Sequence, residues 1–269
     1  MRIDITGDAT RFLTQAETFL RGDPLRYTVV ATVAVSQSRN NTAGTRFLTV
    51  RDDDGVRGIA QCTADGRAYL AAVPPEGIPA VVEVLMGLDT PLVSVEGPAA
   101  EIEAFLTHWP GTHERGHTAR LFELGALRTP EVPGTPRLAG PGDLDVGLRM
   151  VQEFHAETGS PRGVARGVAE RQIAAGLWWL WERDGVASAF VARQTEAFGW
   201  ARIGPVYTPP SLRGNGYASA LTAAVCGVIR AEGTEVCLFA DLANPTSNKI
   251  YRAIGFAPVC DFVHHRLAA

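Results

Sequence analysis

The chain has 269 residues, of which 46% are hydrophobic and 20% charged, and its net charge is −4. This balance is typical of a globular protein, and the acidic excess argues against a nucleic-acid-binding surface, which needs a basic face. No segment is a run of about 20 apolar residues, as a membrane helix requires. The first residues also lack the basic and apolar parts of a signal peptide. We therefore expect a cytoplasmic protein with no membrane or nucleic-acid partner.

The cysteines and histidines show no pattern of metal ligands. None of the four cysteines forms a C-x-x-C pair, and Cys226 and Cys237 lie in apolar runs, which is typical of buried core residues. His264 and His265 are adjacent and would face opposite sides of a strand. We predict no metal site.

A boundary between two domains is predicted near the middle of the chain. The segment 129–142 contains four prolines and three glycines, which are rare together in a helix or a central strand. We interpret it as a linker between a domain over 1–128 and a second domain over 143–269. The oligomeric state does not follow from the sequence.

Helices and strands alternate in the first half in a way that predicts an α/β domain. Two Asp-Gly turns separate β-rich segments and favour a three-stranded meander. In chain order we predict a helix over 10–35 with a break at 22–24, strands at 47–50, 58–63 and 68–73, a helix at 79–86, a strand at 92–96, a helix at 99–109 and a strand at 118–124.

The second half repeats this order of elements. Its first helix is amphipathic, with Leu144, Leu148 and Val151 on one face. We predict helices at 143–157 and 164–175, strands at 177–182, 186–193 and 198–207, a helix at 216–232, a strand at 236–240, a helix at 245–254 and a final strand at 258–267. The shared order indicates a tandem duplication of one α/β unit with a mixed, mostly antiparallel sheet.

The loop Arg213-Gly214-Asn215-Gly216-Tyr217-Ala218 lies between a predicted strand and a long helix. Its glycines let a diphosphate approach the backbone, and the helix directs free N–H groups and its positive dipole end to the same place. Arg213 adds a cationic fork for phosphate oxygens. A Rossmann loop would need a third glycine where Ser219 stands, and the Walker G-K-[ST] sequence is absent. A glycine-rich helix start with a surface arginine is the alternative interpretation of these residues.

With its surroundings, this loop resembles the acetyl-CoA motif of the GNAT superfamily of N-acetyltransferases, [Q/R]-x-x-G-x-[G/A]. Arg213, Gly216 and Ala218 fill its three fixed positions. A second signature follows one helix and one strand later, from Asn244 to Gly255-Phe256, with Tyr251 at the spacing of the family. The resemblance implies that residues 213–218 bind the diphosphate of acetyl-CoA, and that the backbone of Val206 and Thr208 pairs with its pantetheine arm.

Asn244 and Tyr251 have both structural and functional interpretations. Asn244 followed by Pro245 is a favoured helix start, and the resemblance implies that Asn244 also contacts the cofactor. Tyr251 lies about two helical turns later on the same face. It is either a packing residue or, as the resemblance implies, the general acid that protonates the departing thiolate.

A general base is not evident. Some family members place a glutamate in the strand before the diphosphate loop, but residues 198–206 contain no carboxylate. Water is one alternative, since positioning of the two reactants lowers much of the barrier. The other candidates are Glu153, His155, Glu157, Glu196, His264 and His265.

The first half is similar in order but lacks the motifs. At the corresponding place the chain has Glu76 and no arginine-glycine loop, and Glu96-Gly97-Pro98 replaces the Asn-Pro helix start. We therefore predict a degenerate GNAT-like domain that packs against the second half and shapes the acceptor site, or an unrelated α/β module.

Taken together, the resemblance implies an acetyl-CoA-dependent N-acetyltransferase that transfers an acetyl group to an amine by direct attack in a ternary complex. The acceptor is not identified by the sequence. The alternative is a non-catalytic acyl-CoA sensor or interaction protein that keeps the diphosphate loop.

Overall fold

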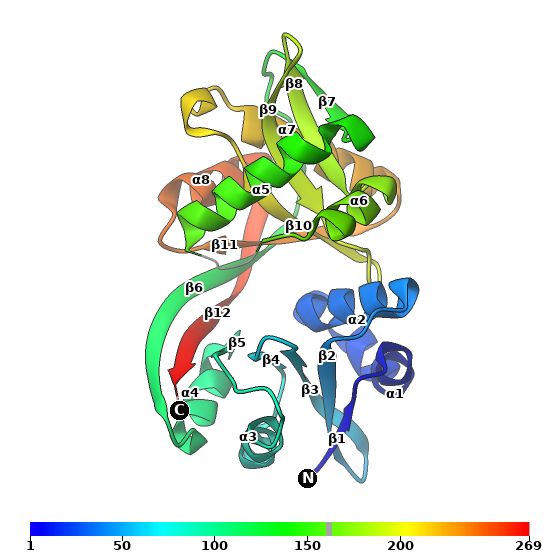
Figure 1. The fold of residues 1–269 in the computed structure, drawn as a ribbon, viewed down its shortest axis with the longest axis vertical. Helices are drawn as coiled ribbons and strands as arrows, with labels where there is room; N and C mark the ends of the chain where they lie inside the picture. The colour runs from blue at the N-terminus through cyan, green and yellow to red at the C-terminus, as the bar shows by residue number, and fades with distance from the viewer. Residues whose placement is uncertain (160–162, 269) are drawn as a thin grey trace.

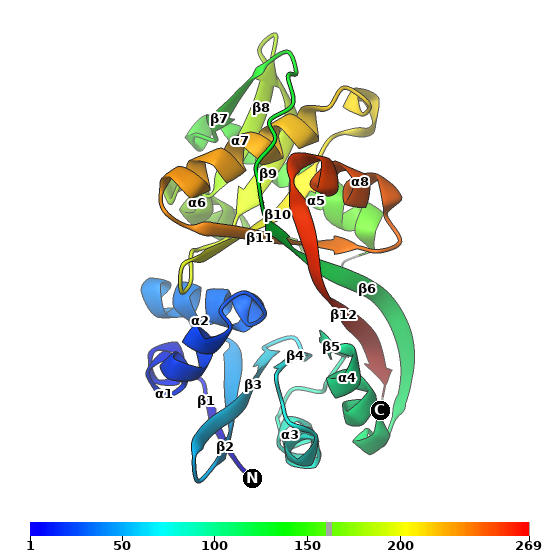
Figure 2. The same ribbon diagram turned by 180° about the vertical axis from the view of Figure 1, so that it is seen from behind.

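The computed structural model of the protein describes residues 1–159 and 163–268. Two α/β halves are stacked along the long axis, and two long strands run from one half into the other along one side (Figure 1). Seen from behind, α7 and α8 cover one face of the upper sheet, and α1 and α2 lie below it (Figure 2). Within the described residues, no helix is long and apolar enough to span a membrane.

The N-terminal half follows the predicted order, with one additional strand at its start. The unpredicted strand β1 is short and forms an edge of the sheet, where it pairs with β2. The elements are β1 (Arg2–Thr6), α1 (Ala9–Gly22), α2 (Thr28–Asn40), β2 (Thr45–Asp52), β3 (Gly55–Thr63), β4 (Arg67–Ala71), a 3₁₀ turn (Pro75–Gly77), α3 (Ile78–Met86), β5 (Ser94–Pro98), α4 (Ala99–His108) and β6 (Thr112–Leu124).

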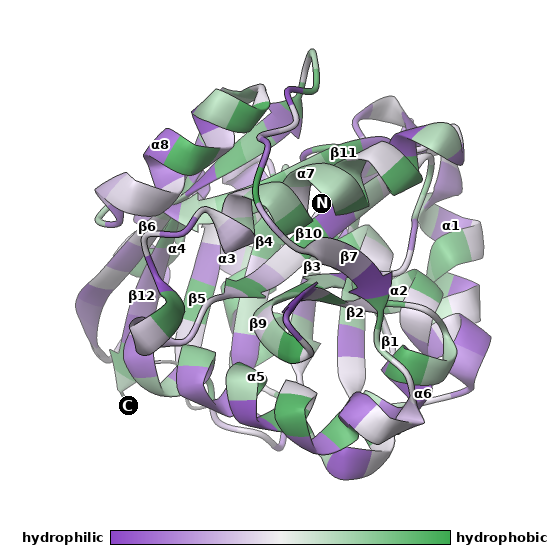
Figure 3. Ribbon diagram, turned by 90° about the horizontal axis from the view of Figure 1, so that it is seen from above, coloured by the Kyte–Doolittle hydropathy of each residue, from purple (hydrophilic) through white to green (hydrophobic). Residues whose placement is uncertain are grey.

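The C-terminal half repeats this order. Its elements are β7 (Thr135–Leu138), a 3₁₀ turn (Pro141–Asp143), α5 (Leu144–Thr158), α6 (Arg166–Ala174), β8 (Trp178–Arg183), β9 (Val186–Arg193), β10 (Trp200–Tyr207), a 3₁₀ turn (Pro210–Leu212), α7 (Tyr217–Ala231), β11 (Glu235–Asp241), α8 (Pro245–Ile254) and β12 (Phe256–Ala268). Hydrophobic and hydrophilic residues alternate along α5, which packs one side on the sheet (Figure 3).

The segment expected as a linker contains a strand. β7 pairs with β8 at the other edge of the sheet, and Pro136 stands in it. An edge position tolerates proline because one side of the strand needs no N–H donor. The proline-rich composition therefore excluded a central strand and not an edge strand.

The two halves exchange their last strands. The described strands form one sheet in the order β1-β2-β3-β4-β5-β12-β6-β11-β10-β9-β8-β7. Read from either edge, five strands of one half are followed by the last strand of the other half. β12 pairs with β5 along Phe262–Arg266, and β6 pairs with β11 along Ala119–Glu123. The domain boundaries 1–128 and 143–269 remain a prediction, and hydrogen bonds of the sheet cross them.

Separate hydrophobic clusters hold the layers together. One lies between the C-terminal sheet and helices α7 and α8, and includes Ile203, Leu238 and Tyr251. Another joins α1 and α2 to both halves and includes Tyr69, Cys237 and Phe262. Since the second cluster draws side chains from β4, β11 and β12, the two halves share a core.

Candidate active site

The glycine loop has the open backbone that an anion site requires. Gly214 and Gly216 have φ values of +83° and +79°, a region that glycine adopts readily. Gly216 is the N-cap of α7, so the first N–H groups of the helix face the loop. A Cβ on Gly214 would meet no atom within 4 Å, and one on Gly216 would meet only Val132 Cγ2, at 3.0 Å. The space beside this helix start is therefore open on the loop side.

The side chain of Arg213 is directed to a carboxylate on another element. Its Nη2 lies 2.6 Å from Oε2 of Glu157 on α5, and its Nε donates to the carbonyl oxygen of Thr208 at 3.0 Å. Tyr207 donates its hydroxyl to Glu157 at 2.9 Å, and Arg213 also lies over the ring of Tyr207. The hydrogen bond from Arg213 holds the pKa of Glu157 below its usual value.

The other loop side chains shape the loop from within. Asn215 donates to the carbonyl oxygens of Leu212 and Arg213, at 3.0 and 3.3 Å. The side chain of Tyr217 is buried in the core beneath α7, and its hydroxyl accepts from Arg183 at 3.3 Å. Tyr217 and Ala218, the first residues of α7, could therefore contact a bound anion through their backbone N–H groups.

Strands β10 and β11 separate in front of this loop. They pair in parallel from Trp200 and Glu235 as far as Ile203 and Leu238, and no further pair is formed in the described residues. The pairing of β10 with β9 shifts between Ile203 and Val206. Val206 and Thr208 follow the separation, and the hydroxyl of Thr208 is buried without a hydrogen-bond partner. The two residues predicted to bind pantetheine therefore lie in the part of the chain where β10 no longer pairs with β11.

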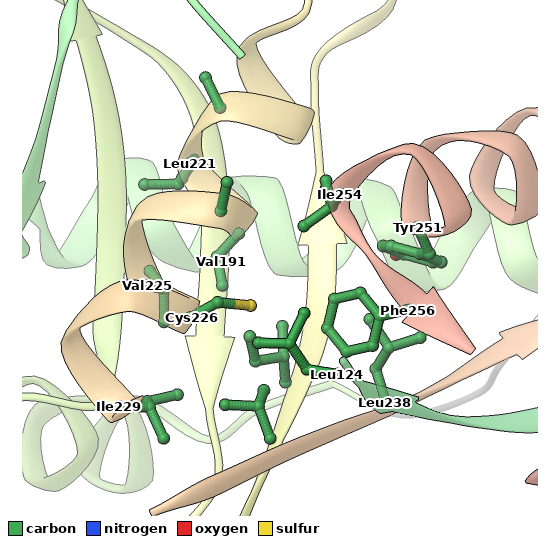
Figure 4. Packing of buried hydrophobic residues seen from close by; sticks show 14 of the residues in the cluster. Leu124, Val191, Leu221, Val225, Cys226, Ile229, Leu238, Tyr251, Ile254 and Phe256 are labelled. Carbon is green, nitrogen blue, oxygen red and sulfur yellow. The ribbon is translucent and has the colours of Figure 1, made fainter. Parts of the chain in front are cut away.

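Tyr251 is buried close to the point where the strands separate. It is 8% exposed and belongs to the same hydrophobic cluster as Ile203, Leu238 and Tyr217. Figure 4 shows it on α8, beside Phe256 and near Leu238, and its ring makes an edge contact with Phe256. Burial raises the pKa of Tyr251 to about 12. The phenol is therefore protonated throughout the neutral range.

Asn244 caps its own helix, and a second asparagine supports it. The side chain of Asn244 accepts from the backbone N–H of Ser247 at 3.0 Å. Asn248, which sequence reasoning did not single out, is buried and donates to the carbonyl oxygens of Asp241 and Asn244 at 2.8 and 2.7 Å. The capping role of Asn244 is thus satisfied locally, and Asn248 fixes the turn between β11 and α8.

The candidate bases are placed differently from one another. Glu157 is held by Arg213 and Tyr207, and its lowered pKa makes it a weaker base than an ordinary glutamate. Glu196 accepts from the backbone N–H of Gly199. Glu153 pairs with Arg149 within α5, and His155 is on the same helix. His264 stacks on His117 of β6, and His265 makes an edge contact with His113 of the same strand. Among these candidates, Glu157 contacts the glycine loop through its ion pair with Arg213.

In the first half, a glutamate side chain of that half occupies the backbone donors at the position that corresponds to the glycine loop. β4 and β5 are parallel, like β10 and β11, but the 3₁₀ turn after β4 runs directly into α3 without a glycine loop. Glu101 on α4 accepts from the backbone N–H groups of Ala72 and Val73, at 3.0 and 2.9 Å. Burial raises the pKa of Glu101 to about 7. A carboxylate of the protein thus occupies the backbone donors that follow β4.

Comparisons with known proteins agree with this fold. Residues 184–263 match the family model described as FR47-like protein. No match was found among curated proteins. An acetyltransferase of the GNAT family from Colwellia psychrerythraea is 13% identical with a TM-score of 0.64, and all of both chains is covered. A GCN5-related N-acetyltransferase from Sphaerobacter thermophilus is 19% identical with a TM-score of 0.62, covering 98% of this chain and 95% of that one.

A third structure also repeats the two-part arrangement. It is a tandem GNAT protein from the clavulanic acid biosynthesis pathway, 13% identical with a TM-score of 0.58, which covers 99% of this chain and 98% of its own. The resemblance to the GNAT superfamily and the prediction of two tandem α/β halves are confirmed. The protein thus has the tandem GNAT fold, with an FR47-like segment in its C-terminal half.

Proposed function

We propose that the protein is an acetyl-CoA-dependent N-acetyltransferase with one active site, in its C-terminal half. The observation that carries the proposal is the open glycine loop at the start of α7, directly after the separation of β10 from β11. In the GNAT superfamily this is where acetyl-CoA binds. Residues 213–218 would hold the diphosphate, the backbone of Val206 and Thr208 the pantetheine arm, and Asn244 the neighbouring part of the cofactor.

The loop residues present fit a diphosphate. The space beside Gly214 is open, and the uncapped N–H groups of α7 offer donors and a positive dipole end. Arg213 would have to turn from Glu157 or share its guanidinium. The pair is 48% and 43% exposed, and exposed pairs contribute only about 0–1 kcal/mol, so a multiply charged anion can displace the carboxylate.

The reaction requires a free amine to attack the thioester carbonyl, so that a C–N bond forms and the C–S bond breaks. A base or water takes the proton that the amine loses, and the leaving sulfur needs a proton. Tyr251 is the candidate donor, because it stays protonated at neutral pH. A thiol has an ordinary pKa near 8.5, so the buried phenol is the weaker acid. It would act by donating a hydrogen bond to the developing thiolate, and the proton that the amine loses would balance the protonation of the free thiolate.

Calorimetry on the full chain tests the binding part of the proposal. We expect one acetyl-CoA per chain, because Glu101 closes the corresponding place in the first half. Two sites per chain, or none, would refute the assignment. Release of free thiol in the presence of a panel of amines then tests catalysis. Binding without turnover for every amine would favour the alternative, a non-catalytic acyl-CoA sensor.

A further inference from the structure

Arg202 is a charged side chain at the junction of the two halves, and one nitrogen of its guanidinium has no hydrogen-bond partner. It lies on β10, opposite Cys237 of β11 and one residue before the strands separate. Its Nη1 is buried and makes no hydrogen bond, while the negative charge of Glu96 acts on the guanidinium as a whole. Burial lowers the pKa of Arg202, although the residue as a whole stays partly exposed. A buried cation is costly unless it is paired, so such a group calls for an explanation.

The side chain faces the N-terminal half. Ala201 and Ile203 belong to the cluster beneath α7, and alternation along a strand places Arg202 on the opposite face, as it does Cys237. Two positions later, a Cβ on Gly204 would meet no atom within 4 Å. Open space therefore lies beside Gly204 of β10, two residues from Arg202.

The N-terminal half contributes further polar groups to this face. The hydroxyl of Tyr69 on β4 and Oε1 of Gln61 on β3 are buried without hydrogen-bond partners, and the two residues are register neighbours. Tyr69 and Arg202 are close enough for each to shift the pKa of the other. Glu96 lies opposite Tyr69 on β5. Its negative charge raises the pKa of both Tyr69 and Arg202.

We propose that Arg202 and Tyr69 recognise an oxyanion on the acceptor, so that the amine substrate is one that carries a carboxylate or a phosphate, such as an amino acid or a phosphorylated amino sugar. A guanidinium and a phenol are both donors, and together they match the oxygens of such a group. This inference rests on the proposed function and gives the N-terminal half a part in it, since Tyr69 belongs to that half.

The experiment compares acceptors in matched pairs with the full-length chain. Each pair differs only in the oxyanion: an amino acid and the amine left after loss of its carboxylate, or glucosamine 6-phosphate and glucosamine. The variants are Arg202→Met, Tyr69→Phe, and the control Arg193→Met, which removes an arginine paired with Glu232 from β9 of the same sheet. Tyr69→Phe keeps the ring that stacks on Phe262 and removes only the hydroxyl.

For at least one pair, we expect the wild type to prefer the oxyanion member by about 10-fold in kcat/KM, because hydrogen bonds to charged groups are stronger than neutral ones. Arg202→Met should lower kcat/KM for that member about 10- to 100-fold, mainly through KM. The neutral member, the affinity for acetyl-CoA and the control variant should be unaffected. Tyr69→Phe should give a smaller loss for the same member. The carboxylate and phosphate arms show which oxyanion is preferred.

An equal loss for both members of a pair in Arg202→Met would overturn the proposal, because Arg202 would then only support the fold. A wild type that prefers the neutral members would overturn it too. If no amine is acetylated, thermal unfolding with bound CoA decides: the oxyanion amines should raise Tm for the wild type and not for Arg202→Met. No rise with any of them would refute the proposal, whereas loss of acetyl-CoA binding in calorimetry would refute the proposed function.

Discussion

The guanidinium of Arg213 and the carboxylate of Glu157 form a two-oxygen contact, with Nη2 at 2.7 Å from Oε1 and 2.6 Å from Oε2. Arg213 stands in the glycine loop, and Glu157 is near the end of α5, so the contact ties the loop to a helix on another part of the chain. The residue expected to hold a diphosphate is therefore held by a carboxylate of the protein. Binding of acetyl-CoA through this loop must compete with Glu157.

Glu157→Gln should strengthen the binding of acetyl-CoA. The amide removes the negative charge that holds Arg213, and exposed ion pairs contribute about 0–1 kcal/mol, so we expect a decrease in Kd of up to about 5-fold. Calorimetry with acetyl-CoA measures it. Glu170→Gln is the matched control, because Glu170 pairs with Arg166 on the surface of α6. Weaker binding in Glu157→Gln would mean that the pair organises the loop instead of competing with the ligand.

Gly216→Glu and Gly214→Glu should abolish acetyl-CoA binding and leave the fold intact. A carboxylate there would fill the open space and repel the diphosphate. Gly233→Glu is the matched control, since Gly233 has the same φ of +79° as Gly216 and lies beyond the other end of α7 in open space. The strain of a side chain in the left-handed region is thus common to the compared variants.

Circular dichroism and calorimetry on the glycine variants separate folding from binding. Gly214→Glu is the more informative of the two loop variants, because Gly216 also faces Val132 and its substitution requires a small shift. A native spectrum with an unchanged Kd in Gly214→Glu would show that the loop does not hold the diphosphate.

Most of the fold could be predicted from local signals. Glycine, proline and Asp-Gly turns mark the element ends, and Asn244 and Gly255 were expected at the two ends of α8, where the structure has them. The strands β1 and β7 were missed because short edge strands carry little hydrophobic pattern and tolerate proline. The exchange of β6 and β12 could not be predicted from local sequence, because the residue pattern of a strand does not show which neighbouring strand it pairs with.

The site was predicted by its motif and not by its long-range contacts. The glycine loop and the buried position of Tyr251 follow from residues close in sequence. The contact of Arg213 with Glu157 and that of Glu101 with Ala72 join residues far apart in the chain. Arg202 lies in a predicted strand of mostly apolar residues, and a charged residue in such a strand is itself a signal of function.

Tyr251→Phe should lower kcat and leave the affinity for acetyl-CoA nearly unchanged. The ring would still pack on Phe256, and only the donor to the leaving sulfur would be lost. Removal of a positioned acid typically costs on the order of 10²-fold or more in rate. Tyr27→Phe is the control, because Tyr27 is a partly buried tyrosine that stacks on Phe19 of α1, far from the glycine loop in sequence. The measurement needs an amine that the wild type acetylates. With one available, an unchanged kcat would identify Tyr251 as a packing residue.

The partly buried carboxyl of Glu101 should make the protein more stable at pH 5 than at pH 8. Its pKa is about 7 in the folded chain, above the ordinary value of 4.5, so the folded state binds more protons than the unfolded state between these values. The free energy of unfolding therefore falls as pH rises through this window, and the contribution is lost above about pH 7. A shift of this size corresponds to on the order of 3 kcal/mol.

Urea unfolding of the wild type and of Glu101→Gln at pH 5 and pH 8 isolates this contribution. The amide does not titrate, so the variant should lose less stability than the wild type over this range. Any fixed cost of placing an amide against the N–H groups of Ala72 and Val73 cancels when the two pH values are compared. The contributions of the other titrating groups cancel when the variant is compared with the wild type. Glu103→Gln, on the exposed side of the same helix, should behave like the wild type. Equal pH dependence in wild type and Glu101→Gln would mean that the carboxyl titrates near its ordinary pKa, with its charge well compensated by the two backbone donors.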